Sequence, residues 1–324
     1  GNQYFRYYKL ANAEAITLSG QVAIRWIESK MNIYLNKLLK TQDVDYVIAS
    51  DTDSIYLHMG PLVETVYKGR EKTTEGVVSF LDKICQMELE KYIESCYKEL
   101  AEYMNAYDQK MQMKRENIAD RGIWTAKKRY ILNVWDSEGV RYEEPKLKMM
   151  GIEAVKSSTP APCRKMIKDA LKLMMNGTEE DVIAFIDNAR KEFRQLPPEQ
   201  ISFPRSASDV NKYKSSSTIY SKGTPIHVRG ALLFNYYIKE AKLTNKYSLI
   251  QNGEKIKFIY LKKPNTIHEN IISFIQEFPK ELNLDKYIDY ELQFEKAFLE
   301  PLKIILDSIG WNIEKTVNLE LFFS

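Results

Sequence analysis

The sequence predicts an α+β protein of two domains, in which small antiparallel hairpins pack against long helices. Two patterns predict this fold class. Several long stretches repeat apolar residues at spacings of three and four, which is typical of amphipathic helices. Elsewhere, short runs rich in β-branched and aromatic residues flank turn-forming residues, as in β-hairpins. With 324 residues and 44% hydrophobic content, the chain can bury a sizeable core.

Two long helices are predicted in the first third of the chain. The first covers residues 11–40, and the second covers residues 78–107. In the first helix, side chains at helical spacing should form one buried stripe: Ile16, Gly20, Ala23, Ile27, Met31, Tyr34 and Leu38. In the second helix, the apolar positions include Phe80, Ile84, Met87 and Ile93.

A β-hairpin is predicted between these helices, at residues 46–57, with its turn at Asp51-Thr52-Asp53. Residues two apart on an extended backbone point to the same side, so the carboxylates of Asp51 and Asp53 should converge at the hairpin tip. Like charges held together repel unless a cation lies between them, and Mg²⁺ favours one or two carboxylates plus substrate phosphates. The alternative is an ordinary solvated turn, because Asp caps its own backbone in turns.

The rest of the chain alternates helices with further hairpins. A strand is predicted at residues 131–135, with a turn at 136–139 and a return at 140–142. Helices are expected from Thr159-Pro160 to Met175, from Thr178 onward, and over residues 285–309. Asn252-Gly253 predicts another hairpin, which would join residues 247–250 to residues 255–260.

The charge is unevenly distributed along the chain, although the net charge is only +3. Residues 201–270 hold 12 Lys plus Arg against 4 Asp plus Glu, a net of +8. Residues 277–324 hold 5 against 10, a net of −5. A basic block in a near-neutral protein favours an anionic partner such as nucleic acid, although a charge run can also be a solvated face.

Membrane and disulfide-rich classes are excluded by the sequence. No apolar run approaches the ~20 residues that a membrane span needs, so no membrane partner is expected. The cysteines Cys85, Cys96 and Cys163 fit neither a disulfide framework nor a metal-binding spacing, which favours a reducing compartment and a packing role.

Several motifs, in a fixed order, resemble those of the family B DNA polymerases of T-even bacteriophages. Asp51-Thr52-Asp53-Ser54, between two strands, resembles the core of motif C. Lys127-Lys128-Arg129-Tyr130 resembles the Lys-Lys-Arg-Tyr motif. Residues 156–160 (Lys-Ser-Ser-Thr-Pro) and 227–230 (His-Val-Arg-Gly) are also similar. Tyr-Phe-Arg-Tyr-Tyr at the start and an acidic-aromatic tail extend the resemblance to both ends of the chain.

The resemblance implies the second part of a polymerase palm followed by a mostly helical thumb. The expected domains are residues 1–153 for fingers and palm with motif C, 154–310 for the thumb, and 311–324 for a C-terminal tail. The 3′–5′ exonuclease domain, motif A and the fingers helix that grips the nucleotide have no counterpart here. We therefore expect one half of a divided polymerase, either natively split or excised from a longer chain.

The mechanism implied by the resemblance is two-metal nucleotidyl transfer, with two Mg²⁺ ions and with Mn²⁺ as a possible substitute. Asp53 is expected to be a direct, catalytic metal ligand, and Asp51 a catalytic residue with a secondary place among the ligands. Glu116, in Met-Lys-Arg-Glu at residues 113–116, corresponds to a peripheral palm carboxylate. Ala49 and Ser50 depart from the residues usual before this motif, which puts the backbone entering the turn in doubt.

The implied partners are primer–template DNA, deoxynucleoside triphosphates, the N-terminal polymerase half and a sliding clamp. Near the active site, duplex would be held by Lys128 and Tyr130, with Lys127, Arg129 and Lys156 beside them. In the thumb, phosphates would be contacted without reading sequence by Lys212, Lys214 and Arg229.

The C-terminal tail is expected to bind the clamp through Leu319, Phe322 and Phe323, whose spacing puts them on one face of a helical turn. The alternative is that both phenylalanines tuck back onto the thumb. If the chain is phage-encoded, its expected location is the host cytoplasm. Two other functions stay open: a non-catalytic DNA-binding subunit, and a metal-dependent glycosyltransferase with an Asp-x-Asp motif.

Overall fold

The computed structural model describes residues 3–215 and 218–313. Over these residues the fold is α+β, as predicted, with helices and three small sheets. The chain divides into two compact units. The first contains Gly1–Asp120 and Val134–Lys146, and the second contains Arg121–Asn133 and Leu147–Ser324. The domain boundary expected near residue 153 stays a prediction.

The first unit is built around two long helical segments. The elements are α1 (Leu10–Leu39), α2 (Gly60–Val66), α3 (Thr74–Ile84) and α4 (Glu90–Tyr103), with a π-helical turn at Cys85–Leu89 between α3 and α4. The second predicted helix is therefore confirmed, but it begins and ends four residues earlier than expected. Thr73 caps α3 by accepting a hydrogen bond from the backbone N–H of Gly76.

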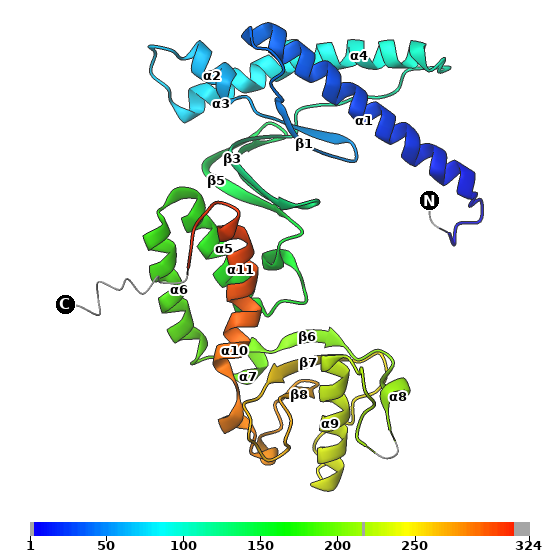
Figure 1. Ribbon diagram of the computed structural model, residues 1–324, viewed down its shortest axis with the longest axis vertical. Helices are drawn as coiled ribbons and strands as arrows, with labels where there is room; N and C mark the ends of the chain where they lie inside the picture. The colour runs from blue at the N-terminus through cyan, green and yellow to red at the C-terminus, as the bar shows by residue number, and fades with distance from the viewer. Residues whose placement is uncertain (1–2, 216–217, 314–324) are drawn as a thin grey trace, which may run out of the picture. The chain divides into compact units, whose positions relative to one another are not determined.

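The core of the first unit lies where α1 crosses α4 (Figure 1). Ala23, Ile27, Met31 and Leu35 are the buried residues of α1. The predicted stripe was right in its middle and wrong at both ends, because Ile16 and Leu38 are exposed and Leu35 is buried instead of Leu38. Among the described residues, burial on α1 is limited to the turns that pack against α4 and β1.

Two small sheets accompany these helices, one between α1 and α2 and one after α4. β1 (Val47–Asp51) pairs with β2 (Ser54–Leu57), which confirms the first predicted hairpin. A second sheet has the order β3-β4-β5, from β3 (Asn117–Ala126), β4 (Arg129–Ser137) and β5 (Val140–Met150). The predicted turn at 136–139 is shorter than expected, since only Glu138 and Gly139 leave the strands, both with positive φ. Asp136 therefore lies within β4.

The second unit begins with a helical layer. A 3₁₀ turn at Glu153–Val155 precedes α5 (Ala161–Asn176), α6 (Glu179–Phe193) and α7 (Pro198–Ile201). A helix was predicted to begin at Thr178, and α6 does begin directly after it. Thr178 and Asp181 form a capping box there. The N-cap of α5 is Pro160, one residue later than predicted, and no side chain caps it.

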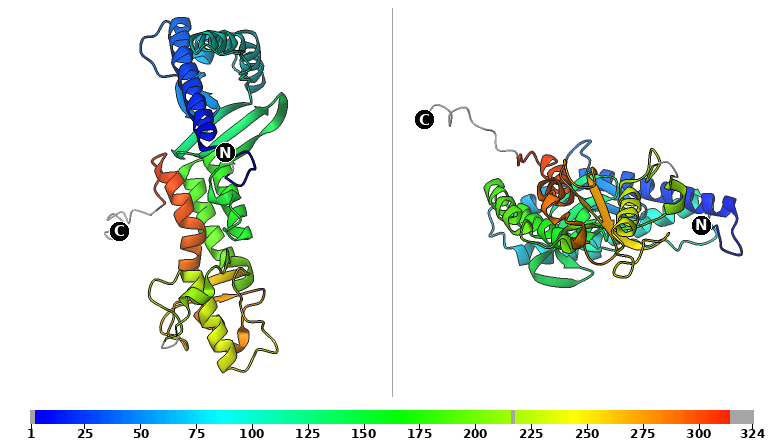
Figure 2. Two further views of the ribbon diagram at one scale, coloured as in Figure 1. Left: turned by 90° about the vertical axis from the view of Figure 1, so that its right-hand side faces the viewer. Right: turned by 90° about the horizontal axis from the view of Figure 1, so that it is seen from below.

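The last helical segment packs against this layer. It runs through α10 (Tyr290–Phe294), a π-helical turn at Glu295–Leu299 and α11 (Glu300–Asp307), after 3₁₀ turns at Lys280–Leu282 and Asp285–Tyr287. The predicted final helix thus begins five residues late, where Asp289 caps α10. Both views in Figures 1 and 2 (left) show α11 beside α5 and α6.

A third sheet with one covering helix completes the second unit (Figure 1). Its antiparallel order is β6-β7-β8, from β6 (Phe203–Ser206), β7 (Lys255–Tyr260) and β8 (Ile271–Phe274), and α8 (Val210–Tyr213) and α9 (Ile226–Glu240) lie between β6 and β7 in sequence. α9 packs on β8 at Gly230, where a Cβ would lie 2.4 Å from Ser273 Oγ. Only glycine allows this approach.

The hairpin predicted around Asn252-Gly253 is wrong. Gly253 does occupy a turn with φ of 85°, but residues 247–250 form no strand. β7 finds its partners in β6 and β8 instead. The backbone of Ile250 is held by the side chain of Asn235, at 2.7 and 2.9 Å.

Among the described helices, none has the length and apolar character needed to cross a membrane.

Candidate functional site

The β1–β2 hairpin presents Asp51 and Asp53 at its turn. Asp51 ends β1 and pairs with Ser54, so only Thr52 and Asp53 form the turn. Asp51 is half-buried, whereas Asp53 is exposed. Ala49 and Ser50, the departures from the usual motif, lie within β1 opposite Tyr56 and Ile55. The strand entering the turn is therefore regular, apart from an irregular register between Val47 and Ala49.

The backbone between the two aspartates is not extended, which corrects one premise of the sequence argument. Thr52 has φ of 56°, in the left-handed region. The N–H of Asp53 donates to the carbonyl of Asp51 at 2.6 Å, and Ser54 Oγ donates to the same carbonyl at 3.1 Å. The placement of the carboxylates is thus set by a tight turn, not by strand alternation. Thr52 Oγ1 donates to Asp51 Oδ1 at 2.9 Å.

Two asparagines of α1 fix the start of the hairpin. Asn32 Oδ1 accepts hydrogen bonds from the N–H groups of Tyr46 and Val47, at 2.8 and 3.0 Å. Asn36 binds both the N–H and the carbonyl of Val44, at 3.1 and 2.7 Å. Sequence reasoning missed both residues. Their signal was available, because two Asn at i and i+4 inside a long helix are unfavourable there unless they bind backbone elsewhere.

The hairpin turn lies near α4. Tyr97 of α4 is buried, and its pKa is raised first by that burial and second by the negative charge of Asp53. The Asp53 carboxylate is therefore exposed to solvent on one side and close enough to α4 to act on a buried tyrosine. It has the properties of a charge available to an external cation.

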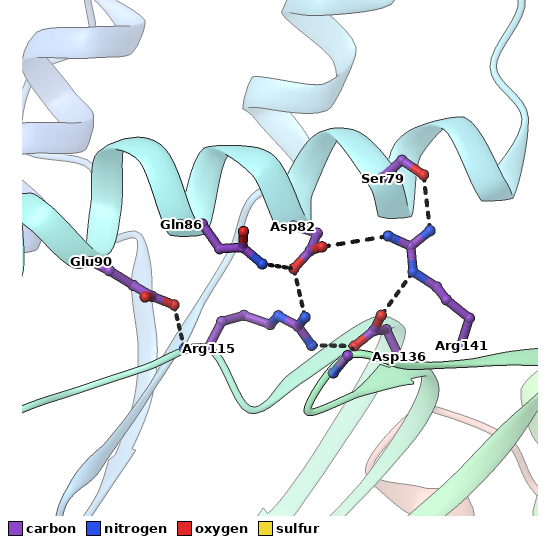
Figure 3. A network of polar contacts seen from close by, with 8 residues as sticks. Ser79, Asp82, Gln86, Glu90, Arg115, Asp136 and Arg141 are labelled. Carbon is purple, nitrogen blue, oxygen red and sulfur yellow. Dashed lines mark hydrogen bonds and ion pairs between the residues drawn. The ribbon is translucent and has the colours of Figure 1, made fainter.

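Glu116, the third predicted metal ligand, follows a residue that is rigidly held. Arg115 pairs with Asp82 of α3 at 2.6 Å and with Asp136 of β4, and its N–H donates to Glu90 Oε1 at 3.0 Å (Figure 3). The carbonyl of Glu116 accepts a hydrogen bond from the N–H of Glu138 at 2.6 Å. The backbone at Glu116 is thus fixed on both sides.

Arg141 completes this network, which we call the arginine network: Ser79, Asp82, Arg115, Asp136 and Arg141 (Figure 3). Asp136 has 0% of its side chain exposed, and Arg115 has 9%. Burial alone would raise the pKa of Asp136. Hydrogen bonds from the Gly139 N–H and the two arginines outweigh burial and hold that pKa below its ordinary value.

The carboxylates fit a hard divalent cation only in part. Carboxylate oxygens are the ligands that Mg²⁺ takes, usually one or two of them together with substrate phosphates. Asp51 and Asp53 can supply such a pair. Among residues 3–215 and 218–313, no three His, Cys, Asp or Glu side chains are grouped so that they could hold a metal ion. The structure therefore does not group Glu116 with the two aspartates.

The Lys-Lys-Arg-Tyr motif also lies at a hairpin turn. Lys127 and Lys128 form the two-residue turn between β3 and β4, and both are exposed. Lys128 has φ of 59°. Gly151 supports this turn, because a Cβ there would lie 2.4 Å from the Lys128 carbonyl oxygen. Tyr130 is buried, with its ring 6.3 Å from that of Trp124.

Arg129 and Lys156 share one carboxylate. Arg129 binds Glu153 through two hydrogen bonds at 3.0 and 2.8 Å, and Lys156 binds it at 2.8 Å. Burial would raise the pKa of Glu153, but these two cations lower it overall. The structure thus brings Arg129 and Lys156 together, with part of their charge already neutralised.

Two of the three predicted thumb residues, Lys214 and Arg229, contact Tyr220, whereas Lys212 lies over the ring of Tyr213. Arg229 of α9 lies over the ring of Tyr220 at 5.7 Å and donates to Asn270 at 2.7 Å. Lys214 forms a β-bridge with Tyr220, and Lys212 is an exposed residue of α8. The predicted clamp-binding residues Leu319, Phe322 and Phe323 lie outside the described residues.

Comparison with known proteins agrees with the resemblance seen in the motifs. The profile of DNA polymerase family B matches residues 1–309. The chain is 36% identical to the DNA-directed DNA polymerase of Enterobacteria phage T4 over 335 aligned residues, which cover 100% of this chain and 37% of that protein. It is 37% identical to the DNA-directed DNA polymerase of Escherichia phage RB69 over 332 aligned residues, covering 98% of this chain and 36% of that protein.

The chain therefore spans little more than a third of the length of these relatives. The match does not favour the glycosyltransferase alternative. The order of the motifs, the hairpin that carries Asp51 and Asp53, and the extent of both alignments lead to one conclusion: this chain belongs to DNA polymerase family B.

Proposed function

We propose that this chain supplies motif C and a DNA-holding surface to template-directed DNA synthesis. The observation that carries the proposal is the β1–β2 hairpin, whose tight turn presents Asp53 to solvent without a cation partner among the described side chains. The reaction is inferred from family membership, because the similar proteins of phages T4 and RB69 are DNA-directed DNA polymerases. The reaction class is nucleotidyl transfer from a deoxynucleoside triphosphate to a primer.

Asp53 acts as a direct ligand of the divalent ions in this proposal. Bound Mg²⁺ would activate the primer 3′-hydroxyl and hold the triphosphate. Asp51, fixed by Thr52 and by its place in β1, steadies the turn and contributes a second carboxylate. Glu116 keeps a peripheral role, at a backbone position fixed by the arginine network. The Mn²⁺ ion is expected to substitute, since its ligand preferences are similar.

DNA is held by the exposed cations that the sequence identified. Lys127 and Lys128 extend from the β3–β4 turn toward solvent and are suited to phosphate contacts. Arg129 and Lys156 both bind Glu153, which links the start of β4, next to this turn, to the 3₁₀ turn at Glu153–Val155. Lys214 and Arg229, which contact Tyr220, and Lys212, which lies over Tyr213, are further proposed phosphate contacts on the basic segment of the chain. These contacts set affinity and register without reading sequence.

The remaining parts of the reaction are proposed to come from segments outside these 324 residues, in a separate polypeptide or in the same longer chain. A polypeptide with the family's motif A and fingers would supply the other bridging carboxylate and the nucleotide-gripping residues. A sliding clamp is the proposed partner of Leu319, Phe322 and Phe323. The chain by itself is proposed to be inactive, because a two-metal site needs carboxylates that bridge both ions.

Primer extension tests this proposal. The purified chain is assayed with a primer–template, the four deoxynucleoside triphosphates and Mg²⁺, alone and together with the polypeptide that carries motif A and fingers. We expect extension only from the assembled enzyme, and only with a divalent cation present. Extension by the chain alone would contradict the proposed division of the site, and DNA binding without extension in every combination would favour a non-catalytic subunit.

A further inference from the structure

A groove of about 400 Å³ lies within the second unit, between the 3₁₀ turn at Glu153–Val155 and the first turns of α5. Three of its lining residues are cationic, and the other three have small apolar side chains. The lining residues are Ala154, Val155, Ala161, Arg164, Lys165 and Lys168. No carboxylate is among them, so the groove carries three positive charges and no negative one.

The cations of the groove lie on one face of α5. Arg164 and Lys168 are four residues apart, Lys165 and Lys168 are three apart, and Lys172 continues the row by another four. Side chains at these spacings are neighbours on a helix, and like charges there destabilise it. Arg164, Lys165 and Lys168 form no ion pair with any residue in the part of the chain that the structure describes. Their repulsion is therefore not relieved within the protein.

The neighbouring helix α6 shows the opposite arrangement. Its first turn holds Glu179, Glu180 and Asp181, and its last turn holds Arg190 and Lys191, which complements the helix dipole. α5 has no acidic residue in its first turn and has cations just after it. The positive end of the α5 dipole and the cations of the groove thus reinforce each other. An anion bound in the groove would interact favourably with both.

The small side chains that line the groove leave room for an extended, polyanionic ligand. Ala154, Val155 and Ala161 have short side chains, and Val155 is exposed. A sugar–phosphate backbone can therefore approach α5 closely, and the long side chains of Arg164, Lys165 and Lys168 can reach its phosphates. Because an α-helix rises about 1.5 Å per residue, Arg164 and Lys168 lie about 6 Å apart along its axis, so their side chains can reach different phosphates of one strand.

We propose that this groove, with Arg164, Lys165 and Lys168, binds phosphates of the DNA backbone. The site is additional to the predicted contacts at Lys128, Lys156 and Arg229. The inference deepens the proposed function and rests on it for the identity of the ligand as DNA. It requires nothing of the carboxylates at the β1–β2 turn, so the two can fail separately.

The salt dependence of DNA binding tests the groove directly. Binding of the full chain to a fluorescein-labelled primer–template duplex is measured by anisotropy between 50 and 300 mM KCl, for the wild type and for the triple variant Arg164→Gln, Lys165→Gln, Lys168→Gln. Each lost phosphate contact lowers the slope of log K against log salt by about 0.9, so we expect the slope to fall by roughly 2 to 3. The single variant Lys165→Gln, expected to lose about 0.9, serves if the triple variant does not fold.

A matched triple variant controls for net charge. Lys191, Lys280 and Lys286 are exposed lysines of the same unit, in segments rich in acidic residues, and none lines the groove. Changing all three to Gln removes the same charge. We expect this control to lower the slope by less than about 0.9, the equivalent of one phosphate contact.

Three results would overturn the proposal. The first is equal slopes for the groove variant and the control while the wild type binds DNA steeply, which leaves the proposed function untouched. The second is a groove variant that loses affinity for dATP but keeps its DNA slope, which makes the groove a nucleotide site. The third is a wild-type chain that does not bind the duplex at all, which also removes the DNA-holding part of the proposed function.

Discussion

Two pairs of aspartates in the first unit deal with negative charge in opposite ways. Asp51 and Asp53 lie at a solvent-facing turn, where Asp53 is exposed and its charge acts on the buried Tyr97. Asp82 and Asp136 lie in the arginine network, where Arg115 joins both and Arg141 adds a second link to Asp136 (Figure 3). Both pairs lie beside the same long helical segment, formed by α3 and α4.

The difference distinguishes carboxylates that stabilise the fold from carboxylates that are available to a ligand. A buried carboxylate must be compensated by a cation and by hydrogen bonds, and once compensated it has little left to offer a ligand. An exposed carboxylate at a turn contributes little to folding and stays available to a metal ion. The comparison indicates a structural role for Asp136 and agrees with the catalytic role proposed for Asp53, and the following substitutions test both.

The largest expected effect on stability is that of Asp136→Ala. Removing this carboxylate leaves Arg115 buried with one partner fewer, which should lower the free energy of unfolding by about 3–5 kcal/mol. Asp53→Ala should change it by less than about 0.5 kcal/mol, as at other exposed positions. Urea denaturation followed by far-UV circular dichroism measures both. Equal losses for the two variants would remove the distinction between the pairs.

Asp82→Ala should have an intermediate effect. Its side chain is 22% exposed, and Arg115 keeps its bond to Asp136 when Asp82 is lost. We expect a loss of about 1–3 kcal/mol, which is the range for hydrogen bonds to charged groups. The same denaturation experiment applies. A loss larger than that of Asp136→Ala would show that α3, not β4, is the main anchor of Arg115.

Acid pH should weaken the network in a defined direction. The pKa of Asp136 is lower in the folded state than its ordinary value of about 3.9, so this group stabilises the fold above that value. The contribution is lost as the pH falls through the folded pKa. The urea midpoint should therefore drop more steeply below pH 4 in the wild type than in Asp136→Asn, which cannot titrate there. Parallel pH profiles would contradict the assigned role.

Ser79→Ala should have the smallest effect. Ser79 Oγ accepts a hydrogen bond from Arg141 at 2.9 Å, and the Arg141 side chain is 39% exposed. Water can replace this partner, so the expected loss is about 0.5 kcal/mol. Thermal denaturation of Ser79→Ala beside the wild type measures it. A loss comparable with that of Asp82→Ala would mean that the outer part of the network is not solvated.

Local patterns in the sequence predicted the elements well. The periodicity of α1 and the turn chemistry of the β1–β2 hairpin are properties of short segments, so they could be read without knowing the fold. The same holds for the start of α6 after Thr178, although the capping box that Thr178 forms with Asp181 was not predicted. The motif spacing then connected these elements to DNA polymerase family B.

Long-range partners explain what the sequence did not predict. Asp136 was taken for a turn residue because Asp is common in turns, yet it is a buried residue of β4. Its charge is compensated by Arg115, 21 residues away, and Arg115 also pairs with Asp82 of α3. The hairpin at Asn252-Gly253 failed because β7 pairs with strands centred near residues 204 and 272. Ile16 was placed in the core because periodicity marks an apolar face without saying which part of it a neighbour covers.

The proposed role of Asp53 as a direct metal ligand can be tested by replacing its carboxylate with a thiolate. Asp53→Cys is assembled into the polymerase, and single-turnover nucleotide incorporation is measured with Mg²⁺ and with Cd²⁺, beside Asp43→Cys as an exposed control in the same unit. A thiolate binds hard Mg²⁺ poorly and soft Cd²⁺ well. We expect the incorporation rate of Asp53→Cys to fall by about 10³-fold or more with Mg²⁺ and to recover in part with Cd²⁺, with neither change in the control. A wild-type rate for Asp53→Cys with Mg²⁺ would contradict the proposed role.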